Sequence, residues 1–107
     1  MKEIYCLGIE STAHTFGASV VRIDTKTNNM NSVLSNERAL YTTSHGGMIP
    51  FNLGKHHEEV CDKILKQALE KANISMKEMN LIAFSNAPGL GHALRIGSIV
   101  AKTLSLK

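Results

Sequence analysis

The sequence between residues 81 and 91 reads Leu-Ile-Ala-Phe-Ser-Asn-Ala-Pro-Gly-Leu-Gly. Its first four residues are all apolar, which is typical of a central strand buried on both faces. The glycines of the following loop let the chain turn tightly and bring the N-terminus of the next helix near a ligand. A periodic apolar segment then continues. The sequence therefore predicts a strand at 81–84, a tight loop at 85–91 and a helix at about 91–106.

Three more strands are predicted upstream. Residues 3–10 form a short apolar run typical of a buried strand. A second strand is predicted at 17–24 and a third at about 31–39. The residues between them, 25–29, are rich in Thr and Asn, which favour turns because their side chains bond to their own backbone. These three strands are expected to form an antiparallel meander.

A long helix is predicted at about 51–72, where apolar residues recur at steps of three and four and form one stripe. Asn73 suits the exit of this helix. Ser75 and Glu78 have the spacing of a capping box, which predicts a short helical turn. The predicted order is β-β-β-α-β-α, an α/β fold with helices packed on a mixed sheet. Residues 1–107 are interpreted as one unit, and we expect it to be part of a longer alternating pattern.

The predicted last helix carries two apolar stripes. A helix that lies on a sheet needs only one, so two stripes indicate burial on both sides. In an isolated domain the second stripe would form an exposed patch, which predicts a partner interface. The first stripe comprises Leu90, Ala93, Leu94, Gly97, Val100, Ala101 and Leu104, and the second comprises Ile96, Ile99, Thr103 and Leu106.

Composition narrows the function classes. The chain is 43% hydrophobic and 20% charged, which argues against disorder. Its net charge of +3 comes from scattered basic residues, which favours solvated surface over a nucleic-acid signature. Cys6 and Cys61 are too far apart for a zinc motif and are interpreted as small core residues in a reducing compartment. No signal peptide or membrane-length apolar run is present, so a soluble cytoplasmic protein is the simplest interpretation.

Two loops are candidates for ligand contact. The polar residues Ser11, Thr12 and His14 follow the first strand, where backbone N–H groups and hydroxyls can hold phosphate; a plain hairpin is the alternative. The loop from Pro88 to Gly91 fits neither a dinucleotide fingerprint nor a P-loop, and a structural turn is the alternative. Glu10 is either a ligand contact or a solvated strand end. The candidate cleft residues are therefore Ser11, Thr12, His14, Pro88, Gly89 and Gly91.

No metal or nucleophilic site is predicted from the residues alone. His56 and His57 are adjacent, so on a helix they point about 100° apart and do not readily share a metal. They are interpreted as capping or packing residues near the start of the long helix. No catalytic residue, nucleophile–base pair or zinc-protease motif can be assigned.

Three motifs together resemble one family, the tRNA N6-adenosine threonylcarbamoyltransferases, once called O-sialoglycoprotein endopeptidases and also Gcp-like. The first is Gly8-Ile-Glu-Ser-Thr-Ala-His-Thr-Phe-Gly17, similar to the opening of the archaeal and eukaryotic branch. The second is Gly46-Gly-Met-Ile-Pro50 with His56-His57. The third is residues 85–91 with Leu94-Arg-Ile-Gly97. They come in family order with family-like spacing over nearly all of the chain.

The resemblance implies an actin/Hsp70-like (ribonuclease H-like, ASKHA) fold, of which this chain is the N-terminal lobe. It implies transfer of a threonylcarbamoyl group from threonylcarbamoyl-adenylate to N6 of adenosine 37 of tRNA. The family's divalent metal, iron or zinc, is held partly by a His-x-x-x-His motif expected just downstream of Lys107. We therefore expect no cofactor within this segment and no activity from it alone. Ala87 replaces the family's usual glycine, Ile49 stands where many archaeal members have histidine, and residues 28–31 resemble an insertion.

The resemblance also implies partners. A small dimerising subunit of the KEOPS complex, or a paralogue similar to TsaB, would dock on the two helices, and the full-length protein would meet a kinase-like KEOPS subunit and tRNA. Two alternatives stay open. One is a non-catalytic split or degenerate paralogue that serves as a docking module. The weaker one is a sugar-kinase-type lobe of the same fold class, which predicts phosphate-loop glycines that this sequence lacks.

Overall fold

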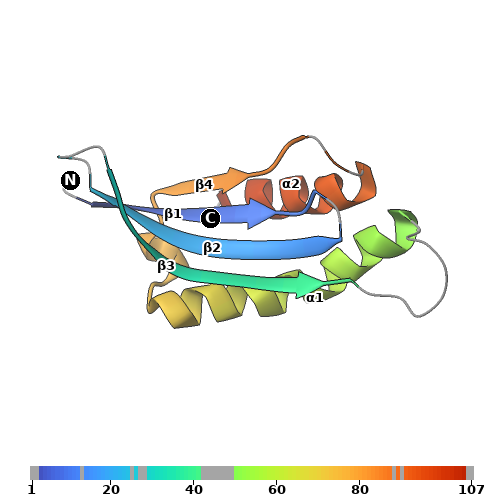
Figure 1. Cartoon of the computed structure of the whole chain (residues 1–107), viewed down its shortest axis with the longest axis horizontal. Coiled ribbons are helices and arrows are strands. Elements are labelled where there is room, and N and C mark those ends of the chain that lie inside the picture. The colour runs from blue at the N-terminus through green and yellow to red at the C-terminus, as the bar shows by residue number, and fades with distance from the viewer. Residues whose placement is uncertain are drawn as a thin grey trace.

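The computed structural model describes residues 3–12, 14–24, 26, 29–41, 50–87, 89 and 91–105 of the chain. Their order confirms the predicted β-β-β-α-β-α pattern (Figure 1), and the predicted short helical turn is a 3-10 helix. The elements are β1 (Glu3–Glu10), β2 (Thr15–Asp24), β3 (Asn29–Leu40), α1 (Pro50–Ala72), η1 (Met76–Glu78), β4 (Leu81–Phe84) and α2 (Gly91–Ser105).

The sheet is mixed, with the strand order β3-β2-β1-β4. β1 pairs antiparallel with β2 and parallel with β4, and β2 pairs antiparallel with β3. The meander prediction is therefore confirmed. Both β2 and β3 are longer than predicted, because Thr15 pairs with Leu40 and Asp24 with Asn29 at the two ends of the ladder. Hydrogen bonding across the pair extends the strands beyond their own apolar segments.

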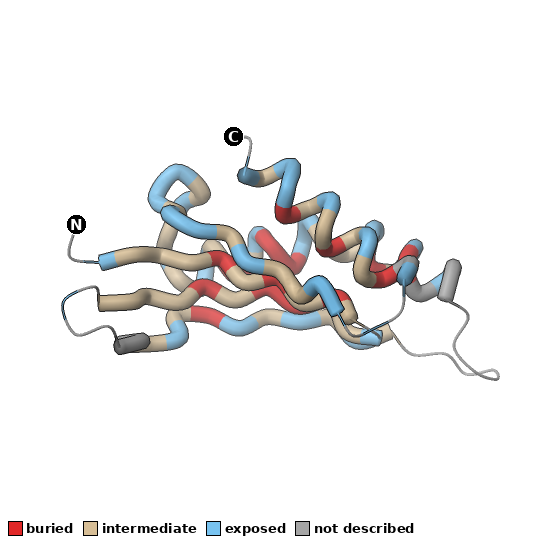
Figure 2. Tube along the Cα trace, turned by 90° about the horizontal axis from the view of Figure 1, so that it is seen from above, coloured by how far each residue is buried: buried red, intermediate tan, exposed pale blue. Residues whose placement is uncertain are grey.

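Both helices pack on one face of the sheet, where the core lies (Figure 2). Burial of these apolar side chains is the main stabilising contribution. On the outer strand β3, Ser35 donates its hydroxyl to the carbonyl of Ala68 in α1 at 2.7 Å, and Glu37 pairs with Lys71 at 2.9 Å. The buried core comprises Leu7, Ile9, Phe16, Ala18, Val20, Ile64, Leu65, Ala68 and Ala101.

The end of α1 follows its predicted local chemistry. Asn73 has a φ of 56°, the left-handed conformation that ends many helices. Its N–H donates to the carbonyl of Glu70 at 3.1 Å, and the N–H of Ile74 donates to that of Leu69 at 3.2 Å, which is the Schellman pattern. The next turn is the predicted capping box, in which the N–H and hydroxyl of Ser75 both donate to Glu78 at 3.2 Å.

The two predicted stripes of α2 differ in how far they are buried. In the first, Ala93, Gly97 and Ala101 are buried against the rest of the molecule. In the second, Ile96 is not free, because it is half-buried and packs on the core. Ile99 is 54% exposed and Thr103 is exposed as predicted, whereas Leu106 and Leu90 lie outside the described residues. Within the described ranges, neither helix is long and apolar enough to cross a membrane.

Candidate functional site at the ends of β1 and β4

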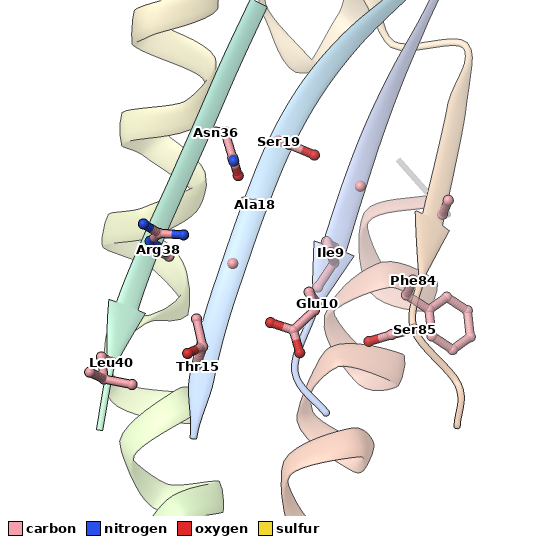
Figure 3. A pocket seen from close by; sticks show the side chains of 13 residues that line it. Ile9, Glu10, Thr15, Ala18, Ser19, Asn36, Arg38, Leu40, Phe84 and Ser85 are labelled. Carbon is pink, nitrogen blue, oxygen red and sulfur yellow. The ribbon is translucent and has the colours of Figure 1, made fainter. Parts of the chain in front are cut away.

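A groove of about 910 Å³ runs along the sheet face that points away from the two helices (Figure 3). Side chains alternate along a strand, so Leu7 and Ile9 enter the core while Gly8 and Glu10 face the groove. The volume suits a small ligand. The groove is lined by Gly8, Ile9, Glu10, Thr15, Gly17, Ala18, Ser19, Asn36, Arg38, Leu40, Ala83, Phe84 and Ser85.

The strand register arranges this lining in cross-strand rows. Glu10 pairs with Gly17, and Gly17 pairs with Arg38, so the carboxylate and the guanidinium stand on either side of a glycine. A Cβ at Gly17 would lie 3.9 Å from the Oε2 atom of Glu10. The next row contains Gly8 and Ser19, and a Cβ at Gly8 would meet the Ser19 hydroxyl at 3.0 Å. Small residues thus form a flat floor with charged groups at one end.

The turn after β1 is stabilised by hydrogen bonds to Glu10 and by contacts with the loop between β4 and α2. The N–H of Thr12 donates to Oε1 of Glu10 at 2.9 Å, and the Thr12 hydroxyl donates to the same oxygen. The N–H of Ser11 donates to the hydroxyl oxygen of Ser85 at 3.2 Å. A Cβ at Gly89 would lie 2.3 Å from the carbonyl oxygen of Thr12, so only glycine allows this close approach of the two loops.

This arrangement brings some of the predicted cleft residues together and leaves others apart. Thr12 and Gly89 come together, whereas His14 and Gly91 are exposed and Pro88 lies outside the described residues. None of the described ones lines the groove. Ser11 is fully buried, and its hydroxyl has no hydrogen-bond partner within the described part of the chain. It packs against α2.

Three groove residues, Thr15, Arg38 and Ser85, were missed by the sequence interpretation. Alternation in β2 and β3 could have placed Thr15 and Arg38 on the face opposite the core. Ser85 follows a parallel strand, and its N–H donates to the carbonyl of Ile9 at 3.0 Å. Only that pairing shows that Ser85 and Glu10 lie at the same edge of the sheet.

The two histidines of α1 are packing residues, as predicted. His57 is fully buried, with its ring centroid 5.8 Å from that of Phe16. His56 is half-buried, 5.2 Å from the ring of Tyr41, and the two histidine Nδ1 atoms are 3.0 Å apart. Burial lowers the pKa of His56, against the smaller opposing effect of Glu59.

This lowered pKa predicts a mild loss of stability in acid. A base whose pKa is depressed by folding favours the folded state above its unfolded pKa, near 6.5, and that advantage is lost as the pH falls. Thermal melts at pH 7.5 and 5.5 should therefore show a decrease that is smaller in His56→Gln, because glutamine does not titrate. Equal decreases in both proteins would assign the acid sensitivity to other groups.

Metal and thiol chemistry find little support in this part of the molecule. Among the described residues, no three His, Cys, Asp or Glu side chains gather as a metal site. They therefore do not fit the divalent metal that the family resemblance implies. Burial raises the pKa of the thiols of both Cys6 and Cys61, which disfavours the reactive thiolate.

Comparison with known proteins decides the family. The model of the tRNA N6-adenosine threonylcarbamoyltransferase family matches residues 31–107. The chain belongs to this family. A threonylcarbamoyltransferase from Sulfurisphaera tokodaii is 50% identical over 101 residues, which cover 94% of this chain and 29% of the relative. One from Thermofilum pendens is 39% identical over 107 residues, covering the whole chain and 30% of the relative. The segment thus spans about 29% of the length of its threonylcarbamoyltransferase relatives.

Solved structures support the fold. YeaZ from Pseudomonas aeruginosa superposes with a TM-score of 0.67 over 96% of this chain and 38% of its own, at 13% identity. A second structure, an uncharacterised protein similar to the peptidase YeaZ from the same organism, has a TM-score of 0.65. At such identity the likeness concerns the fold alone. It confirms the actin-like α/β class expected for this threonylcarbamoyltransferase family member.

Proposed function

We propose that this chain is the N-terminal lobe of a transferase that moves threonylcarbamoyl from threonylcarbamoyl-adenylate to N6 of adenosine 37 in tRNA. The observation that carries the proposal is its 50% identity, over 94% of its length, to a protein named for that activity. The groove, with Glu10 and Ser85 at one end, is then part of the lobe's contribution to the site. The reaction belongs to the cytoplasm, where tRNA is modified.

This lobe alone is proposed to be inactive. The family's metal supplies Lewis-acid and orienting chemistry when bound, and the described residues do not form a place for it. The proposed ligands, a His-x-x-x-His motif, belong to sequence beyond these 107 residues. What this lobe contributes is therefore shape, hydrogen bonding and charge.

An assay for the modified nucleoside tests whether this lobe is inactive alone and active with the rest of the protein. The 107-residue chain is incubated with threonylcarbamoyl-adenylate and tRNA, and N6-threonylcarbamoyladenosine is measured by mass spectrometry. No product is expected from the chain alone, and product is expected once the remaining part of the Sulfurisphaera tokodaii relative is supplied as a second polypeptide. Product from the chain alone would overturn the claim of inactivity. A folded two-part complex without product would favour the alternative below.

The alternative is a docking module for a protein partner. The observation that favours it is a groove of about 610 Å³ between the two helices, lined in part by Leu65, Leu69, Met76 and Leu104. On the same helix as Leu104, Ile99 is 54% exposed. A small dimerising KEOPS subunit or a TsaB-like paralogue is the proposed occupant, and the kinase-like KEOPS subunit and tRNA are proposed partners of the full-length protein.

Ile99→Asp tests the docking surface. Because Ile99 is exposed, the charged side chain remains in water, and the helical circular dichroism signal and melting temperature of the isolated chain should barely change. Binding to the small KEOPS subunit, measured by calorimetry, should be abolished, since the interface would bury an unpaired charge. Leu40→Asp is the matched control, because Leu40 is equally exposed on the opposite face of the sheet. Unchanged binding by a folded Ile99→Asp variant would place the interface elsewhere, and loss of folding would show that Ile99 belongs to the core.

A further inference from the structure

We propose that the Glu10–Thr12 end of the groove binds a ligand through the ligand's own N–H donor, and does not bind phosphate. The assignment follows from counting which hydrogen-bonding groups of the turn are already used. It deepens the proposed function, which supplies the identity of the ligand. The count itself does not depend on that function.

Two backbone donors of the turn, the N–H groups of Ser11 and Thr12, are occupied. A phosphate site in a turn needs backbone N–H groups that point at the anion. Here the N–H of Ser11 donates to Ser85 at 3.2 Å, and the N–H of Thr12 donates to Glu10 at 2.9 Å. The hydroxyl proton of Thr12 is also directed at Glu10. A phosphate held by these groups would have to break these bonds.

The acceptors of the turn remain available. Glu10 uses Oε1 for both bonds to Thr12, and within the described part of the chain its Oε2 has no partner. Gly17 leaves the space beside Oε2 open to the groove. Oε2 of Glu10 therefore requires a donor from the ligand.

The charge of Glu10 also favours an N–H donor over a phosphate. No ion pair between described residues includes Glu10; the pair between Glu37 and Lys71 lies on the opposite face of the sheet, against α1. An unpaired, half-buried carboxylate repels an anion and attracts a polarised N–H, and a hydrogen bond to a charged group is stronger than one between neutral groups. Arg38 lies across Gly17 in the same row and offers the one guanidinium in the groove lining, so a carboxylate elsewhere on the ligand would have a partner.

The substrates of the proposed reaction supply this chemistry in two places. The exocyclic amine of adenosine bears two N–H bonds, and the threonylcarbamoyl group bears one N–H together with a carboxylate. A threonylcarbamoyl group would use both Glu10 and Arg38, whereas an adenine would use Glu10 alone. By this count the phosphate of the donor substrate does not fit the Glu10–Thr12 end.

Two-dimensional 15N–1H NMR of the 107-residue chain tests the inference with three probes: N-carbamoyl-L-threonine, adenosine and inorganic phosphate. One of the two N–H-bearing probes should shift the amide signals of Thr12, Gly17 and Ser85, and phosphate should not. In Glu10→Gln the amide oxygen can still accept from Thr12, but an NH2 group, which donates, takes the place of Oε2. Affinity for the N–H-bearing probe should then fall by roughly tenfold, the loss of one charge-assisted hydrogen bond.

Two further variants separate the outcomes. Glu70→Ala removes an exposed carboxylate from α1 and should leave the affinity unchanged. Arg38→Gln should weaken N-carbamoyl-L-threonine and spare adenosine, which distinguishes the two sources of the N–H group. Phosphate shifts centred on Ser11 and Thr12, or no shift with either N–H-bearing probe, would overturn the inference. Neither result would bear on the transferase assay, because that assay uses the complete substrate and both polypeptides.

Discussion

Replacing Gly97 by alanine is expected to lower the free energy of unfolding by about 1–2 kcal/mol, although alanine is the better helix former. A Cβ at this position would lie 2.1 Å from the hydroxyl of Ser11 and 3.2 Å from its Cβ. Ser11 is fully buried, so it has little room to move. Overpacking costs roughly 1–3 kcal/mol, and the better helix propensity of alanine offsets about 0.5–1 kcal/mol. Urea denaturation followed by circular dichroism measures the difference.

Two controls locate the effect at the Gly97–Ser11 contact. Gly91→Ala places the same methyl group on the same helix where no atom lies within 4 Å, and its effect should stay within about 0.5 kcal/mol. Ser11→Ala removes a buried hydroxyl that has no hydrogen-bond partner in the described part of the chain, so it should be neutral or stabilising. The double variant Ser11→Ala/Gly97→Ala should recover most of the loss. Additive effects would instead place the clash elsewhere in the helix.

The element order could be predicted from sequence because local chemistry and tertiary contacts agree. The capping box at Ser75 and the left-handed exit at Asn73 each specify their structure within a few residues. The apolar run at 81–84 does form a strand, but the prediction of a central strand buried on both faces was wrong, because β4 lies at the end of the described sheet and Leu81 is 52% exposed. Strand ends were predicted less well, because the limits of β2 and β3 are set by each other and not by their own residues. Two-sided burial of α2 was predicted from its stripes, but the stripes could not show that Ile96 would reach the core.

The candidate site was predicted only in outline, for a physical reason. The motif containing Ser11 and Thr12 is visible in the sequence, yet which of its groups face a ligand depends on a contact with a residue 74 positions away. Ser11 and Ser85 meet because β4 lies parallel to β1. The residue pattern likewise does not show that Glu10 and Ser85 accept hydrogen bonds from the N–H groups of this turn. Sequence locates a functional segment, and the sheet decides which atoms it presents.

Phe16→Ala is expected to have the largest effect on stability, about 3–5 kcal/mol, the usual cost of removing a buried phenyl ring. Phe16 is fully buried and is the largest such side chain in the described core. It also packs against the buried ring of His57, at 5.8 Å between centroids, so its loss uncovers a polar group of α1 as well as a cavity. Since domains of this size have about 5–15 kcal/mol in total, the variant should be near the limit of folding.

Leu40→Ala is the matched comparison, because it tests the second face of the same sheet. Leu40 pairs with Thr15, next to Phe16 in sequence, but points to the groove and is 55% exposed. In the isolated chain its loss should cost less than about 0.5 kcal/mol, as for other exposed positions. Thermal melts of the two variants beside the wild type give the contrast directly. A cost for Leu40→Ala close to that of Phe16→Ala would mean that the groove face is covered in solution, by a second copy of the chain, and a concentration-dependent melting temperature would then accompany it.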